Sequence, residues 1–166
     1  MIVIALGANL PSSAGAPAAT LKAALTVLSG CGAPPRAISR FYHTPAWPNP
    51  ADPPFVNAAA LLATRIETRE LLSVLHAVES SFGRVRTPDP RHKYAPRTLD
   101  LDLIDYDGLV EDGPPKLPHP RLGDRAFVLV PLRDVAPFWC HPVTGRDIGD
   151  LIADLGPKAG NLAPFG

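Results

Sequence analysis

The sequence has few cysteines, no excess of charge of either sign and no long apolar run. Only two of its 166 residues are cysteines, Cys31 and Cys140, and their separation fits neither a disulfide framework nor a zinc site. Sixteen basic side chains balance 16 acidic ones, which argues against a protein that binds nucleic acid or a membrane surface by charge. No apolar run approaches the ~20 residues that span a bilayer. Since its first residues carry no signal-peptide pattern, we expect a soluble, cytoplasmic protein with one domain over residues 1–166.

Two common signatures of phosphate and metal chemistry are also missing. The sequence contains no Gly-x-x-x-x-Gly-Lys-Ser/Thr motif, which excludes a P-loop nucleotide site. Its histidines form no His-Glu-x-x-His or other ligand spacing, so we expect no zinc site. A nucleotide or metal would have to be bound by another arrangement of residues.

What the sequence does have is proline and a separation of charge. The 21 prolines predict stiff connections, above all between residues 45 and 54. Residues 84–97 carry five of the 16 basic side chains, Arg84, Arg86, Arg91, Lys93 and Arg97. Residues 100–112 then carry six of the 16 acidic ones and no basic one. In a chain with no net charge, adjacent basic and acidic segments of this kind indicate a candidate functional site.

The order of the predicted elements indicates an α+β fold. Strands are expected at 2–6, 37–43, 55–64 and 99–106, and helices from Pro17 and from Thr68, which has the position of an N-cap. Gly7-Ala8-Asn9 is expected to turn the chain after the first strand, and Gly83 to end the second helix. The order is the βαββαβ of ferredoxin-like folds, with an antiparallel central sheet. Short helices are expected afterwards at 122–135 and 148–155.

The strand from Leu99 carries two aspartates on one face. Side chains alternate along a strand, so Leu99, Leu101 and Leu103 face one way and Asp100 and Asp102 the other, about 7 Å apart. Two carboxylates at this spacing suit magnesium, which prefers a few carboxylates together with water and phosphate oxygens. The alternative is an ordinary half-buried strand with a solvated outer face.

The basic loop directly before this strand suits a polyphosphate. Arginines can bind phosphate oxygens while a metal neutralises the remaining charge. The alternative is a solvated charged loop. Glu79 lies near these arginines, in the last turn of its helix, where it either accepts bonds from a ligand or forms a salt bridge to Arg84 or Arg86.

Aromatic and histidine residues complete the candidate site. Phe55 and Asn57 project to the same side of a strand, and a ring beside an amide can stack on a flat heterocycle and recognise its edge. Phe127 could supply a second ring, although each phenylalanine alone is more typical of a core. His119 is held between two prolines, where it either donates to a phosphate or occupies a simple turn.

Together these residues resemble the hydroxymethyl-dihydropterin pyrophosphokinases of folate biosynthesis. The resemblance covers residues 5 to 135 and rests on several stretches, Ala5–Leu10, Phe41–Pro45, Phe55–Ala58, Glu79 with Gly83–Arg86, Pro96–Asp102, Pro118–Pro120 and Arg125–Val128. The block from Pro96 to Asp102, between the basic loop and the histidine turn, is the most specific of them. The resemblance implies a ferredoxin-like enzyme that transfers pyrophosphate from ATP to the hydroxymethyl oxygen of 6-hydroxymethyl-7,8-dihydropterin and releases AMP.

The resemblance also implies a role for each matching residue. Asp100 and Asp102 would bind two magnesium ions together with ATP, and Arg84 and Arg97 would stabilise charge on the transferred group. The implied ATP-binding residues are His76, Glu79, Arg86, Tyr94, Leu103, Lys116, His119 and Arg125. The implied pterin-binding residues are Thr44, Pro45, Trp47, Phe55, Asn57 and Phe127. From the balanced charge and the missing signal peptide we further expect a cytoplasmic protein without a nucleic-acid or membrane partner, and we expect it to be a monomer.

Several positions depart from the family pattern. Tyr94 stands where a tryptophan is usual and His76 where a glutamine is expected, and Pro114-Pro115 replaces an arginine upstream of Lys116. These changes affect nucleotide affinity more than the type of reaction. Two other functions stay open from the residues alone, a module that binds a nucleotide without turnover and another magnesium-dependent transferase or hydrolase.

Overall fold

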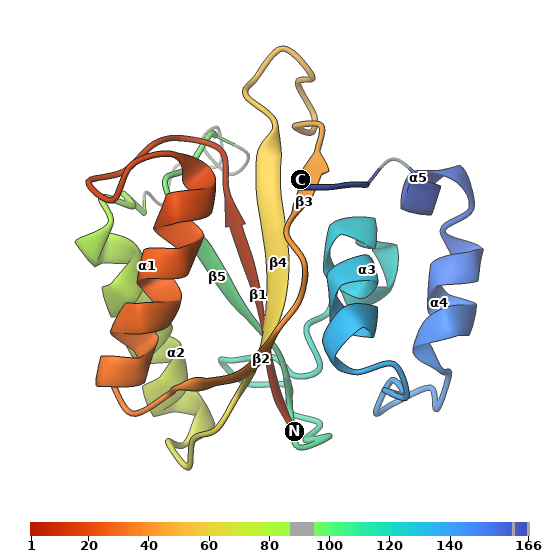
Figure 1. Cartoon of the computed structure of the whole chain (residues 1–166). Coiled ribbons are helices and arrows are strands. Elements are labelled where there is room, and N and C mark those ends of the chain that lie inside the picture. Colours follow the sequence, from red (N-terminus) through yellow and green to blue (C-terminus); the bar gives the residue numbers. More distant parts are fainter. Residues whose placement is uncertain (87–94, 161, 166) are drawn as a thin grey trace.

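An antiparallel sheet with helices on both faces forms the centre of the molecule (Figure 1). The computed structural model describes residues 1–86, 95–160 and 162–165. The strands are β1 Ile2–Ala8, β2 Pro35–Ile38, β3 Tyr42–Thr44, β4 Phe55–Leu62, β5 Asp100–Tyr106 and β6 Ala163–Pro164. The helices are α1 Pro17–Gly30, α2 Thr68–Ser81, α3 Ala126–Val135, α4 Ile148–Asp154 and α5 Pro157–Gly160, with a 3-10 turn at Leu122–Asp124. None of the helices in this described part is long and apolar enough to cross a membrane.

The strand order confirms the ferredoxin-like fold. The sheet runs β5-β1-β4-β3-β6, with β2 also paired to β4, and every pair is antiparallel. β1 therefore lies between β4 and β5, the strands that follow the proline-rich and basic loops. The ends of both loops consequently meet beside β1.

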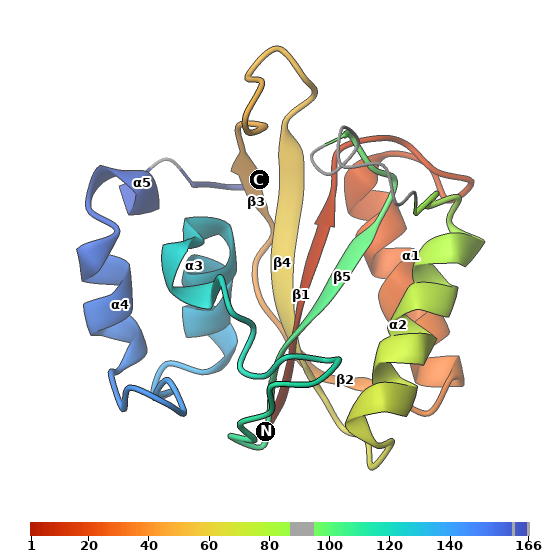
Figure 2. The ribbon, with the colours of Figure 1, turned by 180° about the vertical axis from the view of Figure 1, so that it is seen from behind.

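Alternation along β1 divides the core into two layers. Ile4 and Leu6 pack with buried residues of α1 and α2, whereas Val3 and Ala5 face the cluster around α3 and α4. Figure 2 shows α1 and α2 together on one face of the sheet and α3 and α4 on the other. Both faces of the central strand are therefore buried, as its wholly apolar sequence predicts.

The predicted elements differ from the observed ones mainly at their ends. β1 continues through Gly7 to Ala8, so the prediction that Gly7-Ala8-Asn9 forms a turn is wrong. α2 begins at Thr68, but Glu67 is its N-cap residue and has no side-chain cap, so Thr68 lies one residue inside the helix. Gly83 has a φ of +82° directly after the helix, the left-handed conformation expected of a terminating glycine.

The predicted strand at 37–43 is divided into β2 and β3. Ser39 interrupts it because its hydroxyl accepts the Ala59 N–H at 2.9 Å, a place that a backbone carbonyl would take in a regular ladder. Arg40 then turns away from β4 and binds Asp134 of α3, with Nη2 2.9 Å from Oδ1. A side-chain bond and a long-range ion pair thus divide a segment that local sequence predicts to be continuous.

Prediction for the core. Leu28→Ala should lower the free energy of unfolding by about 2–5 kcal/mol, because Leu28 is fully buried between α1 and the sheet and truncation leaves a cavity. The neighbouring Val27 is 38% exposed, so Val27→Ala is a matched control with a change of less than about 1 kcal/mol. Urea unfolding measures both values. Equal losses of unfolding free energy in the two variants would contradict the assignment of Leu28 to the buried face of α1.

Candidate active site

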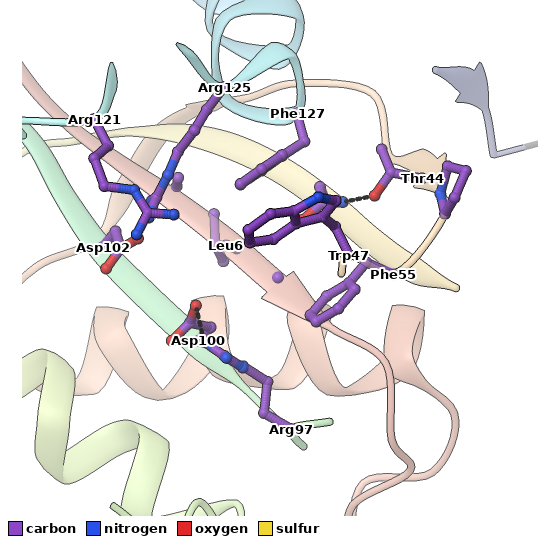
Figure 3. Close-up of a pocket in the computed structure, with 14 residues that line it drawn as sticks. Leu6, Thr44, Trp47, Phe55, Arg97, Asp100, Asp102, Arg121, Arg125 and Phe127 are labelled. Carbon is purple, nitrogen blue, oxygen red and sulfur yellow. Dashed lines mark hydrogen bonds and ion pairs between the residues drawn. The ribbon is translucent and has the colours of Figure 1, made fainter. Parts of the chain in front are cut away.

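A cavity of about 250 Å³ opens on the face of the sheet that carries α3 (Figure 3). Its floor is formed by β1, β4 and β5, and its walls by the proline-rich loop after β3 and by residues at the start of α3. Ten residues implied by the resemblance line it, Thr44, Pro45, Trp47, Phe55, Asn57, Arg97, Asp100, Asp102, Arg125 and Phe127. The fold therefore brings together side chains from four separate stretches of sequence, residues 44–47, 55–57, 97–102 and 125–127.

The two aspartates project into the cavity from β5. Their side chains are 26% and 33% exposed, whereas Leu101 and Leu103 are buried in the core on the other face of the sheet. The predicted alternation is present from Leu99 to Leu103. It ends at Ile104, where the pairing of β1 with β5 shifts by one residue in a β-bulge.

Arginines neutralise both carboxylates. Arg97 Nη1 lies 2.9 Å from Asp100 Oδ2, and Arg84 Nη2 lies 3.5 Å from Asp100 Oδ1. Arg125 Nη1 lies 2.9 Å from Asp102 Oδ2. Within the described residues, the Nε atoms of Arg84 and Arg125 are buried without a hydrogen-bond partner. Buried donors without acceptors are costly, so this cluster favours an anionic ligand with several oxygens.

The other end of the cavity is aromatic. Trp47, Phe55 and Phe127 line it, and the Trp47 side chain is exposed (Figure 3). Buried Asn57 donates from Nδ2 to Thr44 Oγ1 at 2.7 Å, which fixes the orientation of its amide. Rings around an oriented amide can stack on a flat heterocycle and distinguish its donors from its acceptors.

Gly7 is a cavity residue that the sequence analysis missed. It pairs with Asn57 of β4 and with Asp100 of β5, so it lies between the aromatic end and the carboxylates. A Cβ at this position would lie 2.9 Å from Asn57 Oδ1, a distance that side chains essentially never adopt. The glycine therefore keeps the floor of the cavity open. A glycine inside an apolar run was the available signal, since it often marks close approach.

Asn9 is a second residue that the sequence analysis did not assign. It is 3% exposed, its Oδ1 accepts the Arg97 N–H at 2.7 Å, and its Nδ2 donates to the Pro53 carbonyl at 3.0 Å. Its own N–H donates to the Arg97 carbonyl at 3.0 Å. One buried amide therefore connects the start of β5 to the proline-rich loop.

His119 lies at the edge of the carboxylate end. Its Nε2 is 4.0 Å from Asp102 Oδ2, and its N–H donates to the Ile104 carbonyl at 2.9 Å. Burial lowers the pKa of His119 below its ordinary value, and the charges of Arg125 and Arg121 add to that effect, against the opposing influence of Asp102. The imidazole is thereby favoured in its neutral form.

Glu79 lies behind β5 and does not line the cavity. It is fully buried, Oε1 accepts the Leu101 N–H at 2.8 Å, and Oε2 accepts Arg86 Nε at 2.9 Å. The salt bridge to Arg86 that the sequence left open is thus present in the structure. Burial raises the pKa of Glu79, although both hydrogen bonds oppose that change. Its carboxylate holds β5 against the end of α2.

The remaining candidates lie outside the cavity lining. His76 is on α2, and burial lowers its pKa, with a further contribution from Arg86. Leu103 packs in the core, so its side chain is not available to a ligand in the cavity. Lys116 is exposed and its Nζ lies 3.3 Å from Asp112 Oδ1. Tyr94 lies outside the described residues.

The donor set fits magnesium better than a metal that requires a protein cage. Among residues 1–86, 95–160 and 162–165, no group of three or more His, Cys, Asp or Glu side chains could hold a metal. Asp100 and Asp102 supply two carboxylates beside arginines that can bind phosphate. Magnesium is commonly held in this way, by one or two carboxylates, water and substrate phosphates.

The comparisons with known proteins agree on one family. The model of the family described as 7,8-dihydro-6-hydroxymethylpterin-pyrophosphokinase matches residues 3–137, a stretch that contains every residue of the cavity. A pyrophosphokinase for 2-amino-4-hydroxy-6-hydroxymethyldihydropteridine from Synechocystis is 41% identical over 118 residues, which cover 70% of this chain and 58% of the relative. Another, from Methylorubrum extorquens, is 35% identical over 152 residues, which cover 90% of this chain and 92% of the relative.

A solved structure is similar in fold. The HPPK-DHPS protein of Plasmodium falciparum superposes with a TM-score of 0.64 at 12% identity. The superposition covers 98% of this chain but 46% of the Plasmodium chain, so this chain spans less than half of that protein. At this identity the likeness supports the ferredoxin-like fold alone.

Prediction for His119. Because folding lowers the pKa of this imidazole below 6.5, the unfolded chain takes up the proton first as the pH falls. His119 therefore contributes stability that is present above the unfolded pKa and is lost as the pH falls through the folded pKa. His119→Gln should lose less unfolding free energy than the unchanged chain between about pH 8 and about pH 5. Urea unfolding at both pH values gives the difference, and parallel losses in the two chains would contradict the prediction.

Proposed function

Since this chain belongs to the 7,8-dihydro-6-hydroxymethylpterin-pyrophosphokinase family, we propose that it transfers pyrophosphate from ATP to 6-hydroxymethyl-7,8-dihydropterin. The family match confirms the resemblance found in the motifs and the prediction of a diphosphokinase of folate biosynthesis. In the proposed reaction the hydroxymethyl oxygen bonds to the β-phosphorus of ATP. The bond from that phosphorus to the α–β bridging oxygen breaks, AMP leaves, and the hydroxyl proton passes to solvent.

The observation that supports this proposal is the division of one cavity into two ends. Asp100, Asp102 and Arg97 form an end suited to a metal and a polyphosphate, and Phe55 and Phe127 form an end suited to a flat ring. Both substrates would then meet above Gly7, between the two ends. Phosphoryl-type transfer depends mainly on such positioning and on charge stabilisation, so no covalent nucleophile is needed.

We assign the metal site to Asp100 and Asp102, with two magnesium ions bound together with ATP. When bound, magnesium neutralises phosphate charge and favours loss of the hydroxyl proton. Because each carboxylate is paired with an arginine, Arg97 and Arg125 would have to exchange a carboxylate for a phosphate as the substrate binds. The planar guanidinium suits this exchange, since it binds both groups through two parallel N–H bonds.

The other candidate residues divide between the transferred group, ATP and the pterin. We propose that Arg84 and Arg97 stabilise the transferred group and that His76, Arg86, Tyr94, Lys116, His119 and Arg125 bind ATP. Glu79 and Leu103 would act indirectly, through the position of β5. Phe55 and Phe127 would stack on the pterin, while Asn57 and the Thr44, Pro45 and Trp47 loop contact its edge.

We also propose that the chain acts as a cytoplasmic monomer of one domain that does not bind nucleic acid. The neutral net charge supports the last point, because nucleic-acid binding relies on a basic excess. The shared sheet supports a single domain, since both hydrophobic clusters pack against it.

The deciding experiment mixes the protein with magnesium, ATP and the hydroxymethyl-dihydropterin and separates the nucleotides by anion exchange. AMP that forms only when the pterin is present supports pyrophosphoryl transfer. ADP would indicate transfer of a single phosphoryl group and overturn the proposal. ATP that binds but remains intact would leave the chain as a binding module.

Prediction for the carboxylates. Asp100→Asn and Asp102→Asn should each abolish AMP formation while the affinity for the pterin stays within about twofold, because the pterin contacts lie at the other end of the cavity. The isosteric amide removes the charge that magnesium needs. Asp150→Asn, which changes an exposed acid on α4, is the matched control and should retain activity. Turnover like that of the unchanged chain in either cavity variant would exclude the metal assignment.

Prediction for Arg97. Arg97→Ala should lower kcat about 10²–10³-fold, because removal of one donor from a developing anion has costs of this size. The affinity for ATP should fall much less, since Arg84 and Arg125 remain. Single-turnover rates and equilibrium titration separate the two quantities. An unchanged kcat would remove Arg97 from the catalytic group.

A further inference from the structure

Arg121 lines the carboxylate end of the cavity, although no motif singled it out. It follows His119 and Pro120 and directly precedes the 3-10 turn at Leu122–Asp124. Figure 3 shows the Arg121 and Arg125 side chains extending from the same side of the cavity toward Asp102. The Arg121 N–H donates to His119 Nδ1 at 3.2 Å, which fixes the backbone from which the guanidinium extends.

Arg121 differs from the other arginines of the site in its partners. Arg84 and Arg97 contact Asp100, and Arg125 contacts Asp102. Within the described part of the chain, the Arg121 guanidinium has neither a hydrogen bond nor an ion pair, and its side chain is exposed. It is therefore a cation directed into the cavity whose donors are all available.

Arg121 adds a second positive charge beside that of Arg125. Arg121 and Arg125 line the same cavity, and the charges of both act on His119. Like charges repel each other, and Asp102 already accepts a bond from Arg125. A further anion between the two guanidinium groups would remove the repulsion.

We propose that Arg121 binds the phosphate chain of ATP, beside Arg125 and above Asp102. This inference rests on the proposed function and adds a substrate-binding residue to it. A phosphate chain fits because it offers several charged oxygens to two planar guanidinium groups. The pterin is a poorer match, since it is flat and the aromatic rings that suit it lie at the other end of the cavity.

The experiment measures binding without turnover. Its probe is magnesium with α,β-methylene-ATP, in which the bond that breaks in the reaction is replaced, titrated by calorimetry into the full chain. Arg121→Ala should raise the Kd about 10- to 100-fold, the size expected for lost bonds to a charged group. Arg121→Lys keeps the charge but not the planar guanidinium, so its Kd should lie between those of the unchanged chain and of Arg121→Ala. The salt dependence of binding should also be weaker in the alanine variant.

Two controls separate this role from a structural one. Arg65→Ala removes an exposed arginine outside the cavity lining and should leave the Kd unchanged. The Kd for the hydroxymethyl-dihydropterin should be the same in Arg121→Ala as in the unchanged chain. An unchanged nucleotide Kd in Arg121→Ala would overturn the inference. An equal loss of affinity for the nucleotide and for the pterin would overturn it as well. Failure of the unchanged chain to form AMP would instead overturn the proposed function.

Discussion

The site depends on a single row of cross-strand neighbours, Asn57, Gly7 and Asp100. The antiparallel register places Gly7 opposite both of the others. Because adjacent strands lie about 4.8 Å apart, the oriented amide and the first carboxylate are separated by roughly 10 Å. The residue between them has no side chain, so this gap remains open. A shift of one residue in either pairing would turn the amide or the carboxylate to the other face.

Around this row, arginines are paired with the two carboxylates of the cavity. Asp100 and Asp102 are neutralised by arginines that can equally bind phosphate, so neither carboxylate is left as an isolated charge. Glu79 forms a different kind of pair, since it is fully buried and both its oxygens have protein partners. The pairs in the cavity lie where a phosphate could replace either partner, whereas the buried Glu79 carboxylate fixes the strand that carries Asp100 and Asp102.

The sequence alone predicts the parts of this molecule that depend on local pattern. The alternation from Leu99 to Leu103 was sufficient to place Asp100 and Asp102 on one face, and the element order was sufficient for the fold. Gly7 was misassigned because its role comes from strands distant in sequence. β6 was not predicted, since its two residues form a strand only by pairing with β3. Arg121 was missed for the same reason, because only the folded chain brings it to the cavity.

Asn9, directly after the central strand β1, joins the proline-rich loop to the segment before β5. Its amide accepts from the backbone of Arg97 and donates to Pro53, while prolines stiffen the loop that it holds. A displacement of the proline-rich loop would therefore strain the backbone of Arg97. The proline-rich segment and the buried amide together fix the backbone of Arg97 relative to the aromatic end of the cavity, so the fold itself sets part of the geometry that the proposed transfer requires.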